Sequence, residues 1–225
     1  MRLAIACWLA VLAFVCPIVA GAARSGGNGI TSMTPTQIIA QVKQAVAGAK
    51  TVHIYGSGIS DGKPIALDLK LLQGTGGSGH FAEGPLAFDI VRVGPLVYMK
   101  AGKKFWMTTT HNSSLATLFV DKWLSGSATK GDLAAFTPFT DIVKLTNQIL
   151  SQHGKLEKGS TTTINGQPAI AIVDQTDGGT LYVATNGPAY PLLLKAGKND
   201  KGQITFGDWN KPVTVTKPAH SIHFP

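Results

Sequence analysis

The chain has 225 residues, of which 44% are hydrophobic and 14% charged, and 20 Lys and Arg against 12 Asp and Glu give a formal net charge of +8. This length suits one ordinary domain with a sizeable core. Both cysteines, Cys7 and Cys16, lie in the first segment, which excludes a disulfide scaffold for the rest. The basic residues are scattered, so the sequence predicts no nucleic-acid partner.

Residues 1–22 have the three parts of a secretory signal peptide. Arg2 supplies a short basic start, residues 3–19 form an apolar run, and residues 20–23 are small, which suits a signal peptidase. The rival interpretation is a membrane-spanning helix, but the run is near the lower length limit for spanning and no basic stop-transfer cluster follows it. We therefore predict cleavage and export to the cell envelope, the periplasmic space or the extracellular space.

A lipid anchor requires an acylated cysteine with a small residue just before it. Val15, a bulky residue, precedes Cys16. Cys7 has small neighbours, but only six residues stand before it, too few for a basic region and an apolar core. The sequence therefore favours a lipid anchor at neither cysteine.

A flexible linker is predicted over 23–33 from its Gly and Ser content, and a single domain over 34–225. The domain is expected to begin with a helix at 35–48. Thr34 is the candidate N-cap, Pro35 takes the first helical position, and Gln37 completes a capping box. One apolar stripe follows on this helix, formed by Ile38, Ile39, Val42, Ala45, Val46 and Ala49.

The next part of the chain alternates apolar and polar residues with period two, which is typical of strands. Short, closely spaced strands favour an antiparallel meander, because hairpins need only tight turns whereas parallel pairing needs long returns. A glycine-rich turn is predicted over 74–79. The expected strands are those around Val52 and Ile54, then 65–71, 80–83, 86–93 and 95–100, with Phe105-Trp106-Met107 opening another.

Helices interrupt the strands in the middle of the chain. Ser113 or Ser114 is expected to cap a short helix that carries Leu115, Leu118 and Phe119, and a longer helix is expected over 138–151. The chain then returns to strands, for a total of about ten strands and three helices. These later strands are predicted at 155–164, 168–175, 180–185, 191–196 and 202–208.

Motifs for nucleotide, nucleophile and metal chemistry are incomplete. The segment most similar to a phosphate-binding loop has Ser57 where the motif requires glycine and Pro64 where it requires a residue with a hydroxyl group. The segment most similar to a nucleophile elbow has His80 where the motif requires its last glycine. Of the histidines, only His220 and His223 are close together, on what is expected to be a frayed tail. The carboxylates form no pair by spacing. The sequence therefore predicts no metal, no cofactor and no enzyme.

Aromatic residues gather around the expected junction between sheet and helices. The simpler interpretation is that these residues form an ordinary packed core, and the more specific alternative is that they line a cavity. The sequence leaves both open. These residues are Phe81, Phe88, Tyr98, Phe105, Trp106, Phe119, Trp123, Phe136 and Phe139.

Several short stretches carry a resemblance to a known family by their order and spacing. They are Val97-Tyr98-Met99-Lys100, Phe105-Trp106, Trp123, residues 181–184, Tyr190-Pro191-Leu192 and residues 206–213. In this order they resemble the actinobacterial envelope lipoproteins related to LprG and LppX, which are similar in fold to LolA. The resemblance covers roughly residues 34–218.

This resemblance implies an α+β fold, in which helices cover a curved antiparallel β-sheet (a half-barrel) and an apolar cavity holds acyl chains. The implied function is an exported carrier of lipid or glycolipid that meets the membrane surface transiently. A sensor or regulatory binding module on the same fold and a hydrolase without a recognisable motif are the alternatives. Lys100, Lys103 and Lys104 are candidates to meet anionic head groups near a cavity mouth. The expected lining residues are Leu67, Leu69, Phe88, Ile90, Met99, Phe119, Phe139 and Ile142.

Overall fold

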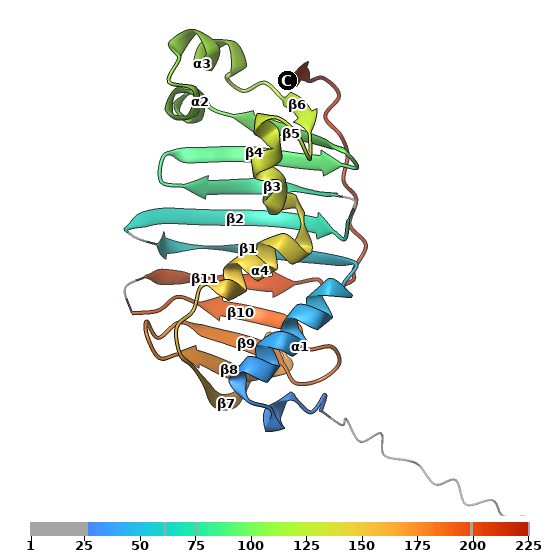
Figure 1. Cartoon of the computed structure of the whole chain (residues 1–225), viewed down its shortest axis with the longest axis vertical. Helices are drawn as coiled ribbons and strands as arrows, with labels where there is room; N and C mark the ends of the chain where they lie inside the picture. The colour runs from blue at the N-terminus through green and yellow to red at the C-terminus, as the bar shows by residue number, and fades with distance from the viewer. Residues whose placement is uncertain (1–26, 61, 75, 199, 225) are drawn as a thin grey trace, which may run out of the picture.

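One continuous sheet organises the chain in the computed structural model, which describes residues 27–224 except 61, 75 and 199 (Figure 1). Within these residues the sheet has twelve strands, two more than the sequence indicated. They are β1 (Thr51–Ser60), β2 (Lys63–Leu72), β3 (Gly76–Glu83), β4 (Leu86–Val93), β5 (Leu96–Ala101), β6 (Leu124–Ser127), β7 (Leu156–Ile164), β8 (Gln167–Asp174), β9 (Thr180–Ala184), β10 (Pro191–Lys195), β11 (Lys201–Gly207) and β12 (Ile222–His223).

Two antiparallel meanders make up this sheet. Strands β1 to β6 form one and β7 to β11 the other, and β1 pairs with β11 to join them. The short last strand β12 pairs with β6 and is parallel to it. The strand order is β12-β6-β5-β4-β3-β2-β1-β11-β10-β9-β8-β7, with β12 and β7 at its two ends, so the described sheet is open. The predicted α+β fold with a curved antiparallel half-barrel is thus confirmed.

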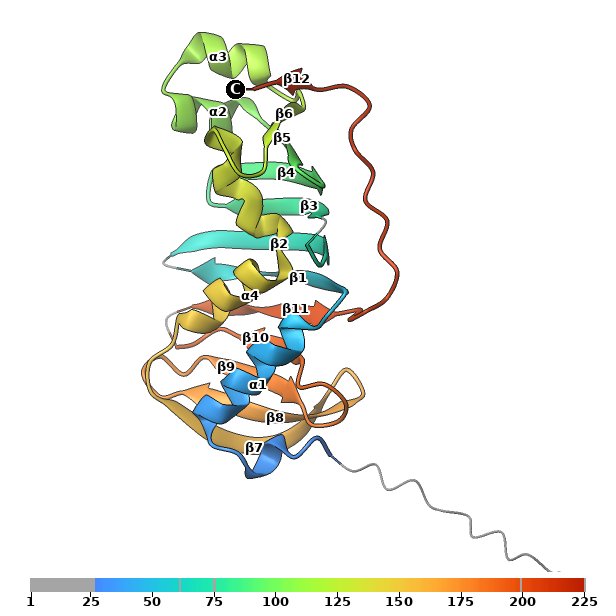
Figure 2. The same ribbon diagram turned by 45° about the vertical axis from the view of Figure 1, so that its right-hand side comes forward.

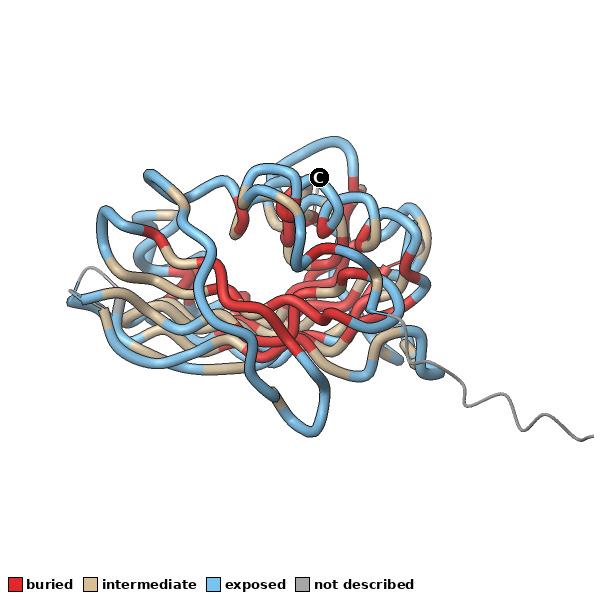
Figure 3. The backbone as a smooth tube through the Cα atoms, turned by 90° about the horizontal axis from the view of Figure 1, so that it is seen from below, coloured by how far each residue is buried: buried red, intermediate tan, exposed pale blue. Residues whose placement is uncertain are grey.

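Helices α1 and α4 and the 3-10 helix η2 cross one face of the sheet, while α2 and α3 lie at its β4–β6 end (Figures 1 and 2). Helix α1 contacts α4, and η2 packs over β2 to β5. Figure 3 shows that the buried residues concentrate between the sheet and this helical layer. The helical elements are η1 (Ile30–Ser32), α1 (Pro35–Ala47), α2 (Lys103–Thr110), α3 (Ser113–Phe119), η2 (Asp132–Thr140) and α4 (Ile142–Ser151).

The predicted first helix is confirmed together with its cap. The Thr34 backbone N–H donates to Gln37 Oε1 at 2.9 Å, and the Gln37 N–H donates to Thr34 Oγ1 at 3.3 Å. This reciprocal pair satisfies two N–H groups that the first turn leaves without a helical partner. Five residues of the predicted stripe are buried: Ile38, Ile39, Val42 and Val46 on the helix, and Ala49 just after it.

The helical middle differs from the sequence prediction. Residues 105–107, predicted as the start of a strand, lie in helix α2, where the Trp106 indole N–H donates to the Ala101 carbonyl at 3.1 Å. Helix α3 is capped by Asn112, not by a serine, because Asn112 Oδ1 accepts from the Leu115 N–H. The predicted helix 138–151 divides in two: a 3-10 helix ends at Thr140, and Asp141 caps α4.

Two local expectations about the sheet and its tail are also wrong, and one strand was missed. The glycines of the predicted turn 74–79 fall partly inside β3, which begins at Gly76. Strand β6 was not predicted because it has only four residues. The C-terminal segment is not frayed throughout: it passes the ends of the strands between β11 and β6 (Figure 2) and forms β12, after which Phe224 contacts Phe119 with ring centroids 5.6 Å apart.

The described part of the predicted linker is packed rather than flexible. Residues 30–32 form η1, whose Ile30 is buried, and Asn28 Nδ2 donates to the carbonyls of Ala184 and Gly187. Lys158 Nζ donates to the Thr31 carbonyl at 2.7 Å. These contacts fasten residues 28–33 to the β7–β9 end of the sheet. The predicted signal peptide, with both cysteines, lies outside the described residues.

In the part of the chain that the structure describes, no helix is long and apolar enough to cross a membrane.

Close approach of neighbouring strands requires glycine at Gly79. This residue pairs with Leu69 of β2 and Ile90 of β4, both fully buried. A Cβ added at Gly79 would collide with the backbone carbonyl of Asp68 in β2. The bare backbone at this position lets the strands come together where the sheet curves.

We predict that Gly79→Ala lowers the free energy of unfolding by about 1–3 kcal/mol, because the added methyl group forces β2 and β3 apart. Urea denaturation followed by circular dichroism measures the change. Gly48→Ala is the matched control, since a Cβ there would make only ordinary contacts and its φ is −89°. An unchanged urea midpoint for Gly79→Ala would contradict this account of the sheet.

Candidate functional site

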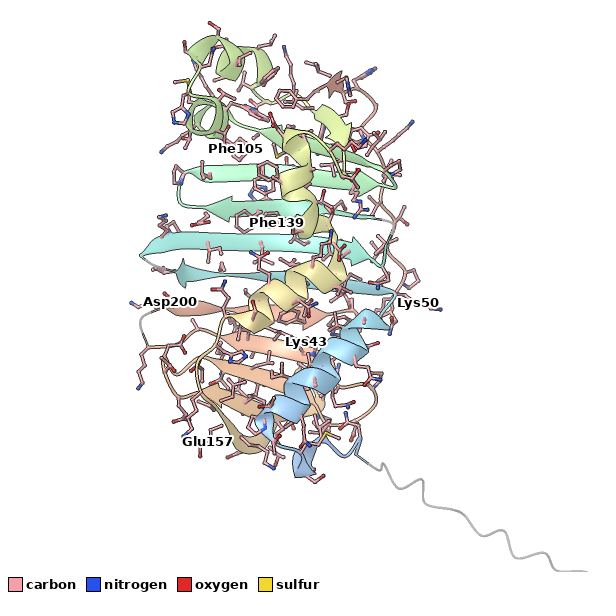
Figure 4. The ribbon with its side chains drawn as sticks, viewed as in Figure 1. Lys43, Lys50, Phe105, Phe139, Glu157 and Asp200 are labelled. Atoms are coloured by element: carbon pink, nitrogen blue, oxygen red, sulfur yellow. The ribbon has the colours of Figure 1, made fainter. Side chains whose placement is uncertain are left out.

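A cavity of about 630 Å³ lies between the sheet and helix α4. It straddles the line where the two meanders meet, since its floor comes from β2 and β3 on one side and from β7 to β11 on the other. Helices α1 and α4 and the end of η2 form its roof, and Phe139 in Figure 4 marks that end. Its apolar lining consists of Ile39, Ile65, Leu67, Leu69, Phe81, Phe139, Leu145, Ile149, Leu150, Leu156, Ile172, Leu181, Leu194 and Ile204.

The alternation of side chains along each strand explains why the floor is apolar. Leu67 and Leu69 are two residues apart on β2, so both point to the helical face, while Asp68 between them points away. The same face continues from β2 through β1 to β11, because Ile54 of β1 pairs with Leu69 of β2 and with Phe206 of β11. The cavity floor therefore belongs to the concave face of the whole sheet.

Polar groups of the cavity gather at one rim, where three connections meet. These are the turn after α4, the β8–β9 turn and the β10–β11 turn; in Figure 4 Asp200 of the last turn lies at this edge of the sheet. The rim turns are tied together, since the Lys198 N–H donates to the Asp177 carbonyl at 2.6 Å. The polar side chains among the lining residues are Gln148, Gln152, His153, Asp174, Thr176, Asp177 and Asp200.

Asp174 is the buried polar residue of the rim, with 7% of its surface exposed. One carboxylate oxygen accepts from the Gly154 N–H at 2.6 Å, and the other accepts from the Thr176 N–H at 2.8 Å. Desolvation of the carboxylate acts to raise its pKa, but these hydrogen bonds outweigh it and hold the pKa of Asp174 below its ordinary value. The charged side chain thus joins the turn after α4 to the β8–β9 turn.

A second hollow of about 180 Å³ adjoins the first at the ends of β1, β2, β10 and β11. Gly56 and Gly58 of β1 line it, and they lie opposite Ile204 and Gly202 of β11. Both glycines let β11 approach β1 closely, because a Cβ at either would collide with the β11 backbone. The two hollows share Ile65, Leu67, Leu194, Ala196, Asp200 and Ile204.

Three of the eight predicted lining residues, Leu67, Leu69 and Phe139, line the larger cavity. The other five lie outside its lining and are buried in the packed core. Phe88 contacts Phe81, Phe105, Phe136 and Phe139, with ring centroids 5.2 to 5.7 Å apart. The buried residues outside the lining are Phe88, Ile90, Met99, Phe119 and Ile142.

The sequence prediction missed the contribution of β8 to β11 to the cavity. Ile172, Leu181, Leu194 and Ile204 supply this part of the floor. Their alternation with outward-facing residues was visible in the sequence, but it does not show which strands lie beneath α4. That information comes from the pairing of β1 with β11.

The lysines considered as head-group contacts lie elsewhere. Lys100 pairs with Asp89 at 3.0 Å, and its ammonium lies 5.2 Å from the centroid of the Trp123 ring. Lys103 and Lys104 begin helix α2. Among the described residues, no lysine lines the larger cavity, and no group of three or more His, Cys, Asp or Glu is arranged to hold a metal ion.

Compared by sequence, the chain matches no protein-family model and none of the curated proteins. Compared by structure, it is similar to LprF from Mycobacterium bovis, with a TM-score of 0.56 and 15% identity over 83% of this chain and 97% of LprF. It also aligns with lipoprotein LppX from Mycobacterium tuberculosis, with a TM-score of 0.46 and 16% identity over 81% of this chain and 98% of LppX. The chain has the LprF-like fold, which confirms at the level of fold the resemblance found in the sequence.

We predict that Asp174→Asn destabilises the protein by about 1–3 kcal/mol at neutral pH, because the amide replaces a charged acceptor of two N–H groups. The pKa of Asp174 is lowered in the folded state, so its contribution is present above the ordinary Asp value of about 3.9 and is lost as pH falls through the folded-state pKa. Urea denaturation should therefore show a difference in the free energy of unfolding between wild type and variant that becomes smaller at acidic pH. An equal difference at neutral and acidic pH would contradict the prediction.

Proposed function

We propose that this protein is an exported carrier, not an enzyme, and that it holds the acyl chains of a lipid or glycolipid in the cavity between sheet and helices. The observation that supports this most directly is the apolar lining of the 630 Å³ cavity, to which both layers of the fold contribute. Its volume lies within the range of about 300–1,000 Å³ that is usual for small-molecule sites. The adjoining hollow extends the space available to a long chain.

Energetics favour an apolar cargo. Each buried methylene contributes about 0.8 kcal/mol, so a long acyl chain leaves a membrane slowly unless it moves into equally apolar surroundings. Leu67, Leu69 and Ile172 on the sheet and Leu145 and Ile149 on α4 offer such surroundings. The cavity thus lowers the cost of crossing the aqueous space between membranes.

The polar rim suits the polar end of such a ligand. Gln148 and Gln152 place amide groups at the rim, and each oxygen of the Asp174 carboxylate already accepts from one backbone N–H group. An acyl chain in the cavity would leave its head group among these side chains. The proposal orients the ligand with its chains beneath α4 and its head group at the β8–β9 and β10–β11 turns.

The positions of the histidines favour a carrier over a hydrolase. His53 contacts Asp68 at 2.8 Å, and His80 contacts Asp89 at 2.8 Å, but all four side chains point to the face of the sheet opposite the helices. At the rim, His153 Nδ1 lies 2.9 Å from the Gly154 carbonyl. These contacts orient His53 and His80 away from the cavity. His153 and Asp174 both line its rim, but each Asp174 oxygen already accepts from a backbone N–H group.

Native mass spectrometry tests the carrier directly. Protein purified from its own envelope should carry extra mass, and organic extraction should release a lipid and return the mass of the chain. A clean apo mass that does not change on mixing with lipid vesicles would contradict the proposal.

We predict that the paired substitution Ile149→Trp and Leu194→Trp abolishes most lipid loading, because the two indoles fill the cavity from its roof and its floor. Both positions are half-buried, so the larger side chains replace empty space rather than packed neighbours. Loading is measured as the lipid-bound fraction in native mass spectra. Leu96→Trp, at an exposed position outside the cavity, is the matched control and should load normally. Equal loading of the paired variant and the control would exclude this cavity as the lipid site.

A further inference from the structure

Helices α2 and α3 form a hairpin at one end of the sheet, away from α1 (Figure 1). Its inner side is anchored by aromatic residues. Trp106 contacts Phe105 and Phe119 with ring centroids 5.1 and 5.6 Å apart, and Phe105 in turn contacts Phe88 of β4 at 5.7 Å. The hairpin therefore has a fixed orientation on the sheet.

The outer side of the same hairpin exposes large apolar side chains. Met107 on α2 is 38% exposed, and Leu115 and Leu118 on α3 are 38% and 50% exposed. Leu115 and Leu118 are three residues apart, so they are neighbours on one face of the helix. Three of the eight large hydrophobic residues that the described structure exposes thus lie on this hairpin.

Lysines border this apolar surface. Lys103 and Lys104 are four and three residues before Met107, which places them beside it on the exposed face of α2. Lys122 follows α3 directly and is exposed. Residues 102–123 contain these three lysines and one acid, Asp121, which gives this segment a net charge of +2 with His111 neutral.

We propose that the outer face of the α2–α3 hairpin docks this protein onto an anionic membrane surface. Exposed apolar side chains that enter the head-group region, bordered by lysines that meet anionic lipids, are the combination that interfacial segments use. We name this surface, formed by Lys103, Lys104, Met107, Leu115 and Leu118, the docking face. Its purpose rests on the proposed carrier function, because a carrier must meet the membrane that holds its cargo.

The docking face and the cavity are separate in the structure. None of the five residues of the docking face lines either hollow. Substitutions in the docking face are therefore expected to leave lipid loading in the cavity intact. Because of this separation, the proposed lipid cavity and the proposed docking face can be tested, and refuted, independently of each other.

Vesicle flotation tests the docking face. The protein in its exported form, without the predicted signal peptide 1–22, is mixed with vesicles of phosphatidylcholine and phosphatidylglycerol, or of phosphatidylcholine alone, and the bound fraction is measured at low and high salt. We expect binding to the anionic vesicles only, weakened by salt because the lysines act through a screened field. Binding that is equal for both vesicles, or absent from both, would overturn the proposal.

Two paired variants assign the binding to named residues. Lys103→Glu with Lys104→Glu should lower the partition coefficient by about twenty-fold or more, since each lysine near an anionic surface contributes about a factor of five. Met107→Ser with Leu118→Ser should lower it by about tenfold or more through the loss of buried apolar area. Binding of either variant equal to that of wild type would overturn the proposal.

Matched controls exclude a general effect of charge or polarity. Lys43→Glu with Lys50→Glu makes the same charge change on exposed lysines at and just after α1, far from the hairpin in Figure 4, and Leu96→Ser removes an apolar side chain of similar exposure. These variants should bind as wild type does. A loss in the lysine control equal to that in Lys103→Glu with Lys104→Glu would show that net charge alone drives binding and would refute the docking face. Native mass spectra of the hairpin variants should still show bound lipid, which separates loss of docking from failure of the cavity.

Discussion

The pairing of β1 with β11 is the interaction on which the rest of the structure depends. It joins residues 53–59 to residues 201–207, and so turns two separate meanders into one sheet. The concave face, the roof formed by α1 and α4, and the cavity all extend across this seam. Loop-closure entropy opposes such a distant contact, and the gain comes from apolar side chains that both meanders bury beneath the same helices. Ile54 and Phe206, paired at the seam, are both buried.

Packing differs along the concave face, and this difference separates a solid end from a hollow region near the middle of the sheet. Beneath η2, aromatic rings from β3, β4, α2 and η2 interlock around Phe88 and fill the space. Beneath α4, the facing residues are mostly Leu and Ile, and Gly56 and Gly58 contribute no side chain to the floor. One sheet therefore supports a rigid core at one end and a cavity near its middle. The solid end fixes the α2–α3 hairpin, while the hollow lies under a helix that joins the two meanders.

Periodicity predicted the faces of the strands but not their places in the sheet. All three strand residues that were expected in the lining but lie outside it, Phe88, Ile90 and Met99, do face the helices, as the register of β3, β4 and β5 shows. They are buried in the solid end because α4 crosses other strands.

Thr34, Pro35 and Gln37, in contrast, identified the first helix from local chemistry alone. The position of a helix over a sheet is set by long-range pairing, which no local pattern encodes. Residues 105–107 have the composition of a strand, yet they form a helix because Phe105 and Trp106 pack into the core from one helical face.

The C-terminal segment connects the two ends of this architecture. After β11 the chain leaves the seam and passes the ends of the strands between β11 and β6 (Figure 2). It then adds β12 beside β6, and Phe224 contacts Phe119 of the hairpin. The contact places Phe224 beside Phe119, one of the buried residues of the α2–α3 hairpin. The strand that closes the seam and the strand that supports the hairpin are thus parts of one continuous segment.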